Sequence, residues 1–542
     1  MAAHSCLTFF EASRQAGMDI KAADAAATPQ DSSASVPPIP ANPVDEISAA
    51  AGATVSAAVN DEKRAGKALL WKAAQLGTSK VVYLLGTLVL GRLLTPNDFG
   101  LVAIATVAIT TVMTATETGM TNALVQATTR EREHYDVAWT IGLIRGSLVC
   151  AVLCLAAPFV AELFGDPRAT PLVRMMAFLP LLNSVNSPRM TDLMRELKFS
   201  RIAVVAILAV IVEVGLSISM AGRLGGAAII LGKLAGAATT AVASYIVAPY
   251  SPRFRPSYAS AKQLIAFGRW LFAIGLTAVI SDFFIKVLVA RRLSVSGLGL
   301  FSLGDRLAET PTQMANESIG AVAFPLYARL KTDPPRLAMA VQAHLTGLMF
   351  LLLPATALII GLAQPLEQRV LGAAWVGTSP IIVLLALGYA CEVSFNVVYF
   401  LLQSLGWGAR LFAAELTQYI VLIASVSLLA GPYGLMGIGV ARIITAIVVA
   451  IAGAKAAPPM FSTILRRTFR TALALVILSS LAGAVAWFGA SIVPGTVGVA
   501  VGLAVGGAAY FLLVLVTDQP LRLGVRAALA LFFPVLRPKT SE

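Results

Sequence analysis

Long apolar stretches fill most of this sequence, and short polar segments separate them. The hydrocarbon core of a bilayer is about 30 Å thick and an α-helix rises about 1.5 Å per residue, so an apolar run of about 20 residues can span it. We therefore expect an all-α integral membrane protein. The pattern predicts about fourteen transmembrane helices, near residues 72–94, 99–118, 137–163, 171–194, 202–221, 225–248, 264–290, 298–323, 338–363, 375–403, 411–430, 434–454, 470–490 and 496–517.

Composition and charge agree with this interpretation. Of the 542 residues, 57% are hydrophobic and only 13% are charged, whereas a soluble domain carries roughly a quarter charged residues. A net charge of +13 could indicate nucleic acid, but Lys and Arg lie in the gaps between apolar runs, where they set membrane topology. We expect no nucleic-acid partner. Their roughly fourfold excess in alternate gaps predicts that both termini are cytoplasmic.

Two pairs of motifs indicate an internal duplication. GRLLTPNDFGL from Gly91 resembles RRLSVSGLGLF from Arg291, and LFGDPRATPLV from Leu163 corresponds to VLGAAWVGTSPII from Val370. Transporters are commonly built from such repeats, which move against each other around a central site. We expect two six-helix bundles related by the repeat, plus two C-terminal helices. The predicted parts are a disordered cytoplasmic tail at 1–66, bundles at 67–250 and 251–460, two additional transmembrane helices at 461–520, and a cytoplasmic tail at 521–542.

The first repeat motif also carries a family resemblance. Together with GMTNALVQ from Gly119 and FPLYARL at 324–330, it resembles the polysaccharide flippase branch of the multidrug/oligosaccharidyl-lipid/polysaccharide exporter superfamily, over roughly residues 67–520. The signature positions are Arg92, Leu93, Leu94, Pro96, Asp98, Phe99 and Gly100.

The resemblance implies a function as well as a fold. It implies a multi-pass transporter of the bacterial inner membrane with two lobes around a partly cationic cavity. The implied cargo is an undecaprenyl-diphosphate-linked oligosaccharide repeat unit, moved from the cytoplasmic to the periplasmic leaflet for lipopolysaccharide or exopolysaccharide biosynthesis. Implied partners are this lipid-linked oligosaccharide, membrane lipids, a polysaccharide polymerase and a chain-length regulator.

Charged residues inside the predicted spans are the candidates for the site. A charge at the centre of a bilayer costs about 3 kcal/mol on insertion scales, so it generally faces an aqueous cavity or a partner. Arg and Lys suit a diphosphate, because they donate charge-assisted hydrogen bonds to phosphate oxygens. The candidates for substrate binding are Arg306, Arg145, Lys80, Lys286 and Arg269. The candidates for ion coupling are Asp282, Asp305, Glu309, Glu117 and Glu317.

Structural roles are open alternatives for these residues. Lys286 can pair with Asp282, and Arg306 with Glu309, only to hold helices together. Glu117 and Glu317 can simply end a helix at the bilayer edge. We also expect two further arginines to extend their charged ends to the membrane interface, namely Arg189 and Arg442.

Other functions are open as well. A multidrug extruder or a peptidoglycan lipid-precursor flippase of the same superfamily is the alternative within transport. An enzyme, such as a polysaccharide polymerase, is disfavoured because the longest predicted outside loop, at 364–374, is too small for a catalytic domain. The four cysteines and three histidines are scattered, so we expect no metal site and no cofactor.

Overall fold

The computed structural model describes residues 71, 72, 74–116, 132–254 and 269–516, and every element in these ranges is a helix. The predicted disordered tail and the predicted C-terminal tail lie outside the described residues. The first group of helices consists of Ala74–Leu93, α3 (Pro96–Ala115), α5 (Arg132–Phe164), α6 (Ala169–Met176), α7 (Leu179–Ser184), α8 (Met190–Arg195), α9 (Phe199–Leu224) and α10 (Ala227–Val247).

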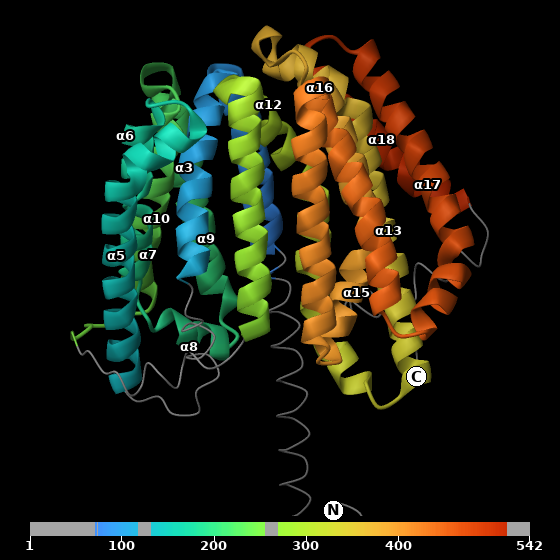
Figure 1. Cartoon of the computed structure of the whole chain (residues 1–542), viewed down its shortest axis with the longest axis horizontal. Coiled ribbons are helices and arrows are strands. Elements are labelled where there is room, and N and C mark those ends of the chain that lie inside the picture. Colours follow the sequence, from blue (N-terminus) through green and yellow to red (C-terminus); the bar gives the residue numbers. More distant parts are fainter. Residues whose placement is uncertain (1–70, 73, 117–131, 255–268, 517–542) are drawn as a thin grey trace, which may run out of the picture. The chain divides into compact units, whose positions relative to one another are not determined.

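The second group begins with the longest helix of the described residues (Figure 1). It consists of α12 (Arg269–Leu330), α13 (Pro334–Pro365), the short turns Leu366–Leu371 and Ala373–Trp375, α14 (Thr378–Cys391), α15 (Val393–Ser404), α16 (Gly408–Ala456), α17 (Met460–Ile492) and α18 (Gly495–Val516).

These helices confirm an all-α, multi-pass membrane protein. In the described part of the chain, nine helices are long and apolar enough to span a bilayer, or ten if α14 and α15 form one bent span. Helices α12 and α16 each cover two predicted spans, with breaks at Ser294 (φ 78°, ψ 166°) and Gly434 (φ 59°, ψ −138°). The count of fourteen, and the domain boundaries drawn from it, stay predictions.

One predicted span differs from a continuous helix. Residues 171–194 fall on α6, α7 and α8, which are separated by short breaks. Proline explains part of this division, because it lacks the backbone N–H that a continuing helix would use. Pro180 lies in the first turn of α7, and Pro188 lies in the non-helical stretch before α8.

The same type of cap begins α3 and the second part of α12. The Asp98 N–H donates to Thr95 Oγ1 over 3.3 Å, and the Gly297 N–H donates to Ser294 Oγ over 3.3 Å. A side-chain oxygen that accepts from the third residue of a helix satisfies one of its unpaired N–H groups. The two repeat motifs predicted from the sequence therefore begin helices in the same way.

Helices α3 and α12 meet at what we call the glycine seam, made by Pro96, Gly100, Val295 and Gly299. A Cβ atom built at Gly100 would overlap the carbonyl oxygen of Val295, and one built at Gly299 would overlap that of Pro96. Counted from the two caps, Gly100 and Gly299 occupy the same helical position. Each helix thus offers its glycine to the first turn of the other.

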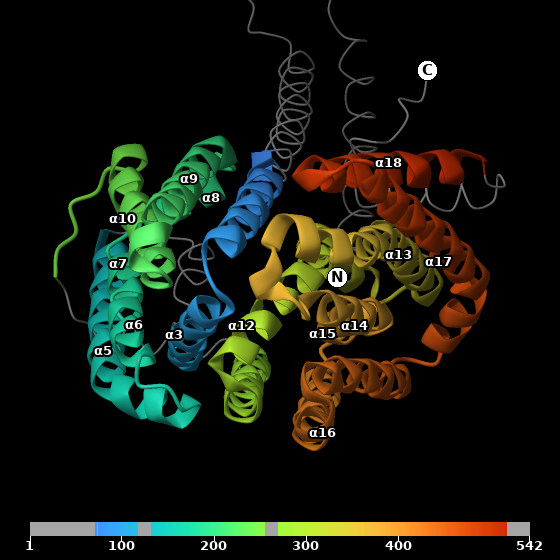
Figure 2. The ribbon, with the colours of Figure 1, turned by 90° about the horizontal axis from the view of Figure 1, so that it is seen from above.

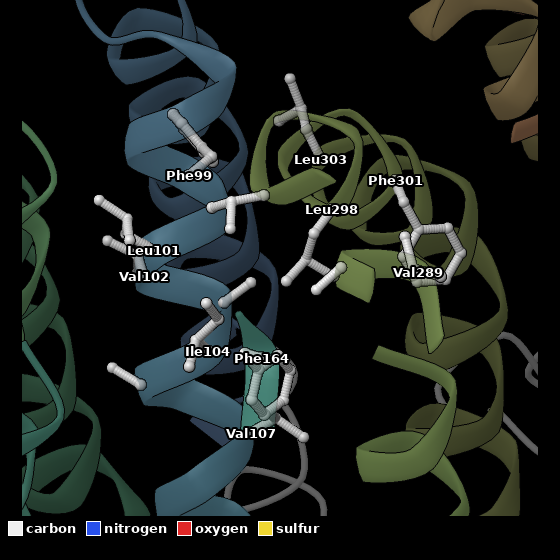
Figure 3. Close-up of a cluster of buried hydrophobic side chains, with 14 of the residues drawn as sticks. Phe99, Leu101, Val102, Ile104, Val107, Phe164, Val289, Leu298, Phe301 and Leu303 are labelled. Atoms are coloured by element: carbon white, nitrogen blue, oxygen red, sulfur yellow. The ribbon is translucent and has the colours of Figure 1, made fainter. Parts of the chain in front are cut away.

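Buried apolar side chains surround the glycine seam. Phe99 of α3 and Leu298 of α12 belong to one cluster, which Phe164 joins from the end of α5 (Figure 3). Trp375 packs its ring edge-on against Phe99, with centroids 5.1 Å apart, and its Nε1 donates to the Gly91 carbonyl over 2.6 Å. The two groups of helices are therefore joined here by a continuous core.

Two arginines reach across beside the glycine seam. Arg291 donates to the carbonyl oxygens of Glu162 and Leu163, over 2.6 and 2.8 Å, at the end of α5. The guanidinium of Arg92 lies beside Gly372, where a Cβ would overlap it. Arg92 lies in the last turn of the helix Ala74–Leu93, Arg291 lies just before the break in α12, and each contacts a helix end or turn of the other group. Such paired contacts are what a duplicated chain would produce.

The last two helices pack on the second group. Gly361 of α13 and Gly483 of α17 bring these helices into close contact, and Gly489 of α17 faces Gly502 of α18. Figure 2 shows α17 on the side of the second group that faces away from α5, and α18 along the adjacent edge. Small residues allow close helix packing in membranes, where apolar burial alone does not drive association.

Candidate functional site

A cavity of about 300 Å³ lies between the helix Ala74–Leu93 and α12, and we call it the central cavity. It lies between the first and second groups of helices, because each group supplies one wall. Hydroxyl, amide and charged side chains dominate its polar lining. These are Ser79, Lys80, Tyr83, Thr87, Arg306, Glu309, Thr310 and Gln313.

Arg306 is the cation exposed to this cavity from α12. The ion pairs of the described residues do not include it, so the predicted alternative of a pair with Glu309 is not realised there. Its guanidinium carbon lies 5.8 Å from the centre of the Tyr83 ring. A cation at this distance is attracted by the ring face while its N–H groups stay available for other acceptors.

The Tyr83 side chain is fixed by residues of α9 and α10. Its hydroxyl donates to Glu213 Oε2 of α9 over 2.5 Å. Glu213 in turn lies 3.5 Å from Lys233 of α10. Three helices of the first group therefore fix the aromatic ring against which Arg306 rests.

Lys80 provides the second cation of the central cavity. Its ammonium group donates to Gln313 Oε1 of α12 over 3.0 Å. This hydrogen bond orients the Lys80 ammonium group at the wall of the central cavity. Lys80 and Arg306 are the two predicted substrate-binding residues that the structure brings into one cavity.

A second polar cluster, here named the C-terminal cluster, lies among α12, α14 and α16 around a cavity of about 120 Å³. Asp282 pairs with Lys286 over 2.7 Å, as the structural alternative predicted. Asp305 accepts a hydrogen bond from the Tyr389 hydroxyl over 2.8 Å. The lysine that was a candidate for binding phosphate therefore has a carboxylate partner on its own helix.

Arg442 belongs to the C-terminal cluster, and the expectation that it reaches the membrane interface is wrong. Its side chain is only 15% exposed and pairs with Glu392 over 2.8 Å. The guanidinium also lies 4.3 Å from the centre of the Tyr389 ring. Glu392 accepts a further bond from Gln418, over 3.2 Å. The physical reason is that a carboxylate and an aromatic face inside the bundle replace the water that an arginine would otherwise seek. Arg189 is exposed, in keeping with an interfacial position.

Arg145 lies in another cavity, away from the residues that line the central one. Its guanidinium donates to the Met113 carbonyl over 2.7 Å and to Thr116 Oγ1 over 3.1 Å, at the end of α3. Carbonyl groups at the end of a helix have no partner within it, so a cation is stabilised there. Arg145 and Arg306, both candidates for substrate binding, therefore lie in different cavities.

The structure describes the side chains of only some of the remaining predicted site residues. Asp282, Asp305 and Glu309 lie on α12, and Glu309 lines the central cavity. The side chains of Arg269, Glu117 and Glu317 are outside those that the structure describes. Sequence reasoning missed Tyr83, Tyr389 and Gln313, since neutral polar residues in apolar runs do not stand out as charges do. In the part of the chain that the structure describes, no three His, Cys, Asp or Glu side chains gather as ligands of a metal ion.

Curated proteins with similar sequences take part in polysaccharide biosynthesis. The succinoglycan biosynthesis transport protein ExoT of Rhizobium meliloti (strain 1021) is 27% identical over 330 residues, which cover 60% of this chain and 66% of that protein. The lipopolysaccharide biosynthesis protein WzxC of Escherichia coli (strain K12) is 24% identical over 304 residues, which cover 55% and 61%. The matched regions thus span slightly less than two thirds of these relatives.

Solved structures share the fold. The lipid II flippase MurJ, in an inward closed conformation, has a TM-score of 0.63 at 13% identity and covers 82% of this chain and 97% of its own. An inward-facing multidrug resistance MATE family transporter of the MOP superfamily has a TM-score of 0.57 at 15% identity and covers 72% and 98%.

A family model supplies the remaining comparison. The model described as polysaccharide biosynthesis protein matches residues 89–380, which begin just before the repeat motif at Gly91 and include the seam and Arg306. These findings confirm the resemblance inferred from that motif. With more than half of its length matched, the chain belongs to the polysaccharide biosynthesis protein family.

Proposed function

We propose that this protein is a flippase for undecaprenyl-diphosphate-linked oligosaccharide repeat units. It moves them from the cytoplasmic to the periplasmic leaflet of the bacterial inner membrane for lipopolysaccharide or exopolysaccharide biosynthesis, with both of its termini in the cytoplasm. The observation that carries the proposal is Arg306, an exposed cation without a carboxylate partner among the described ion pairs, in a cavity between the two groups of helices. The names of ExoT and WzxC support the same class of cargo.

The central cavity suits an anionic headgroup. Arg306 presents a planar fork of donors to phosphate oxygens, and Lys80 adds a point charge on the opposite wall. Ser79, Thr87 and Thr310 add hydroxyl groups. The diphosphate would bind between these walls while the polyprenyl tail remains in lipid. No covalent bond is made or broken, so the protein acts as a transporter and not as an enzyme.

The carboxylates of α12 are proposed to couple transport to an ion. Asp282, Asp305 and Glu309 share this helix with Arg306, so a change of charge on one of them would alter the field at the headgroup. Glu117 and Glu317 remain candidates for the same role. A polysaccharide polymerase and a chain-length regulator are the proposed partners that use the delivered repeat unit.

Export in living cells tests the proposal. A strain that lacks this protein would be complemented with wild type, Arg306→Gln or Lys80→Gln, and lipid-linked glycan would be measured on each face of the inner membrane. We expect Arg306→Gln to accumulate glycan on the inner face and to lose surface polysaccharide. Arg223→Gln is a matched control, because Arg223 is exposed at the end of α9 and does not line the central cavity.

Three outcomes would contradict the proposal. Normal export by an Arg306→Gln variant that is present at the wild-type level would remove the site assignment. Drug resistance that depends on the protein, without any glycan defect in the deletion strain, would instead favour a multidrug extruder. Accumulation of unflipped peptidoglycan precursor would favour a lipid II flippase.

A further inference from the structure

A break in the backbone faces a second cavity within the first group of helices. Between α7 and α8, residues 185–189 belong to no helix, although they lie inside the stretch predicted to span the membrane. Backbone N–H and C=O groups need partners at membrane depth, so such breaks persist where protein or a water-filled cavity satisfies them. Discontinuous helices in transporters accordingly mark binding sites.

The end of α10 holds this break in place. The Ser187 N–H donates to Ser244 Oγ over 2.9 Å, and Ser187 Oγ donates to the Ala248 carbonyl over 2.6 Å. Ser187 and Ser244 are both buried. On the other side, Gly146 of α5 lets α7 approach so closely that a Cβ there would lie 2.7 Å from Ser184 Oγ. Three helices therefore fix the broken segment.

The cavity beside the break, here called the N-terminal cavity, has a volume of about 370 Å³. This lies within the range of about 300–1,000 Å³ that is typical of small-molecule sites. Helices α5, α7 and α10, which lie together in Figure 2, supply most of its walls. Its polar lining includes Trp139, Arg145, Asn183, Asn186, Thr191 and Thr240.

The composition of this lining narrows the class of ligand. Amide and hydroxyl groups both donate and accept, so they suit a ligand that carries many hydroxyl groups. The Trp139 indole adds a flat apolar surface, which suits the C–H face of a sugar ring. Arg145 is the single charged residue among the described lining residues, and its guanidinium already donates to the end of α3. A single arginine provides too little positive charge to neutralise a diphosphate. An apolar lipid tail cannot form hydrogen bonds with amide groups.

Two polar atoms in the lining, Trp139 Nε1 and Asn186 Oδ1, are buried without a hydrogen-bond partner in the described part of the chain. An unsatisfied buried acceptor costs about 1–3 kcal/mol. A ligand hydroxyl or a bound water that donates to Asn186 Oδ1 would recover this cost. Asn183, one turn earlier on α7, is exposed at the same cavity.

We propose that the N-terminal cavity binds a sugar residue of the transported glycan, separately from the headgroup site at Arg306. This inference rests on the proposed function and deepens it. It divides recognition between two places: the central cavity binds the anionic group common to all such lipids, and the N-terminal cavity binds the sugar that differs among them. Changes in the lining of the N-terminal cavity would then alter which glycan is accepted.

Sugar binding to the purified full-length protein in lipid nanodiscs tests the inference. The probe is the sugar mixture released by acid hydrolysis of the producing strain's own surface polysaccharide, followed by saturation-transfer NMR. We expect at least one component to bind the wild type. Asn186→Leu and Asn183→Leu, which keep the side-chain size and remove the amide, should each weaken binding about 3- to 10-fold, as expected for a lost hydrogen bond.

The controls separate this inference from the proposed function. Arg306→Gln should bind the sugars as the wild type does while it fails to export glycan. Loss of sugar binding in Arg306→Gln would place the sugar in the central cavity and overturn the inference. Absence of binding by every component, or unchanged binding in both asparagine variants, would overturn it as well. Unchanged melting temperatures of the variants would show that they are folded.

Discussion

Gly299 of α12 lies so close to the carbonyl oxygen of Pro96 on α3 that no side chain fits between the two backbones. The contact between Gly100 and Val295 repeats this arrangement in the opposite direction. Because both sides of the glycine seam use backbone atoms, its geometry leaves no room for adjustment by side-chain rotation. Closely packed interiors respond to added volume by shifting or straining.

Gly299→Ala should therefore destabilise the protein, although alanine normally favours a helix over glycine. We expect the free energy of unfolding to fall by about 1–3 kcal/mol, the usual cost of overpacking. Thermal unfolding in detergent would measure the effect. Gly507→Ala on α18 is the matched control, since a Cβ there meets no atom within 4 Å. Equal behaviour of the two variants would contradict the geometry of the seam.

Replacing either Arg442 or Glu392 alone should destabilise the protein, whereas replacing both together should cost much less. Removing one partner of a buried pair leaves an unpaired charge and costs about 3–5 kcal/mol. We expect Arg442→Met and Glu392→Leu to lower the melting temperature strongly, and the double variant to recover much of the loss. A double variant as unstable as the sum of the single ones would argue that each residue has other necessary partners.

The pair between Asp282 and Lys286 separates a structural role from a functional one. If Lys286 only balances Asp282, the double variant Asp282→Asn with Lys286→Gln should export glycan normally. The single variant Lys286→Gln should be impaired, because it leaves one carboxylate without its partner, 2.7 Å away in the wild type. Export assays in the complemented deletion strain would decide. Failure of the double variant to export glycan at normal protein levels would indicate that Lys286 or Asp282 takes part in transport itself.

Tyr250, which follows α10, is predicted to stabilise the first group of helices. Burial, and then its hydrogen bond to Asp136, raise the pKa of Tyr250 to about 12, so the hydroxyl is protonated at neutral pH. It donates to Asp136 Oδ1 over 2.7 Å, beside the Arg253 N–H at 2.8 Å. Tyr250→Phe should cost about 1–3 kcal/mol, because buried Asp136 loses a donor. Tyr433→Phe, at an exposed tyrosine, should cost nothing measurable by the same thermal assay.

Apolar run length was enough to predict most helices, because a bilayer imposes one length scale on every span. The broken helix at 185–189 was not predictable in this way. Its polar residues, Asn186 and Ser187, interrupt the apolar run only briefly, and the contact of Ser187 with Ser244 joins residues far apart in sequence.

The candidate site was predictable only in part. Charge at membrane depth marked Arg306 and Lys80 as candidates, and both line the central cavity. Charge alone did not distinguish Arg306 and Lys80 from Lys286 and Arg442. A carboxylate on another turn or another helix pairs with each of the latter two cations, and the sequence does not show these contacts. Tyr83 carries no charge, so nothing in the sequence marked it as the ring beside Arg306.

The backbone contacts at Gly100 and Gly299 also limit how α3 and α12 can move apart. Thermal motion of side chains constantly opens and closes small gaps in a protein, but the carbonyl oxygens of Pro96 and Val295 cannot rotate out of the way. Only a displacement of entire helices separates them. Any transition that separates α3 from α12 is therefore a rigid-body displacement and not a change of rotamers.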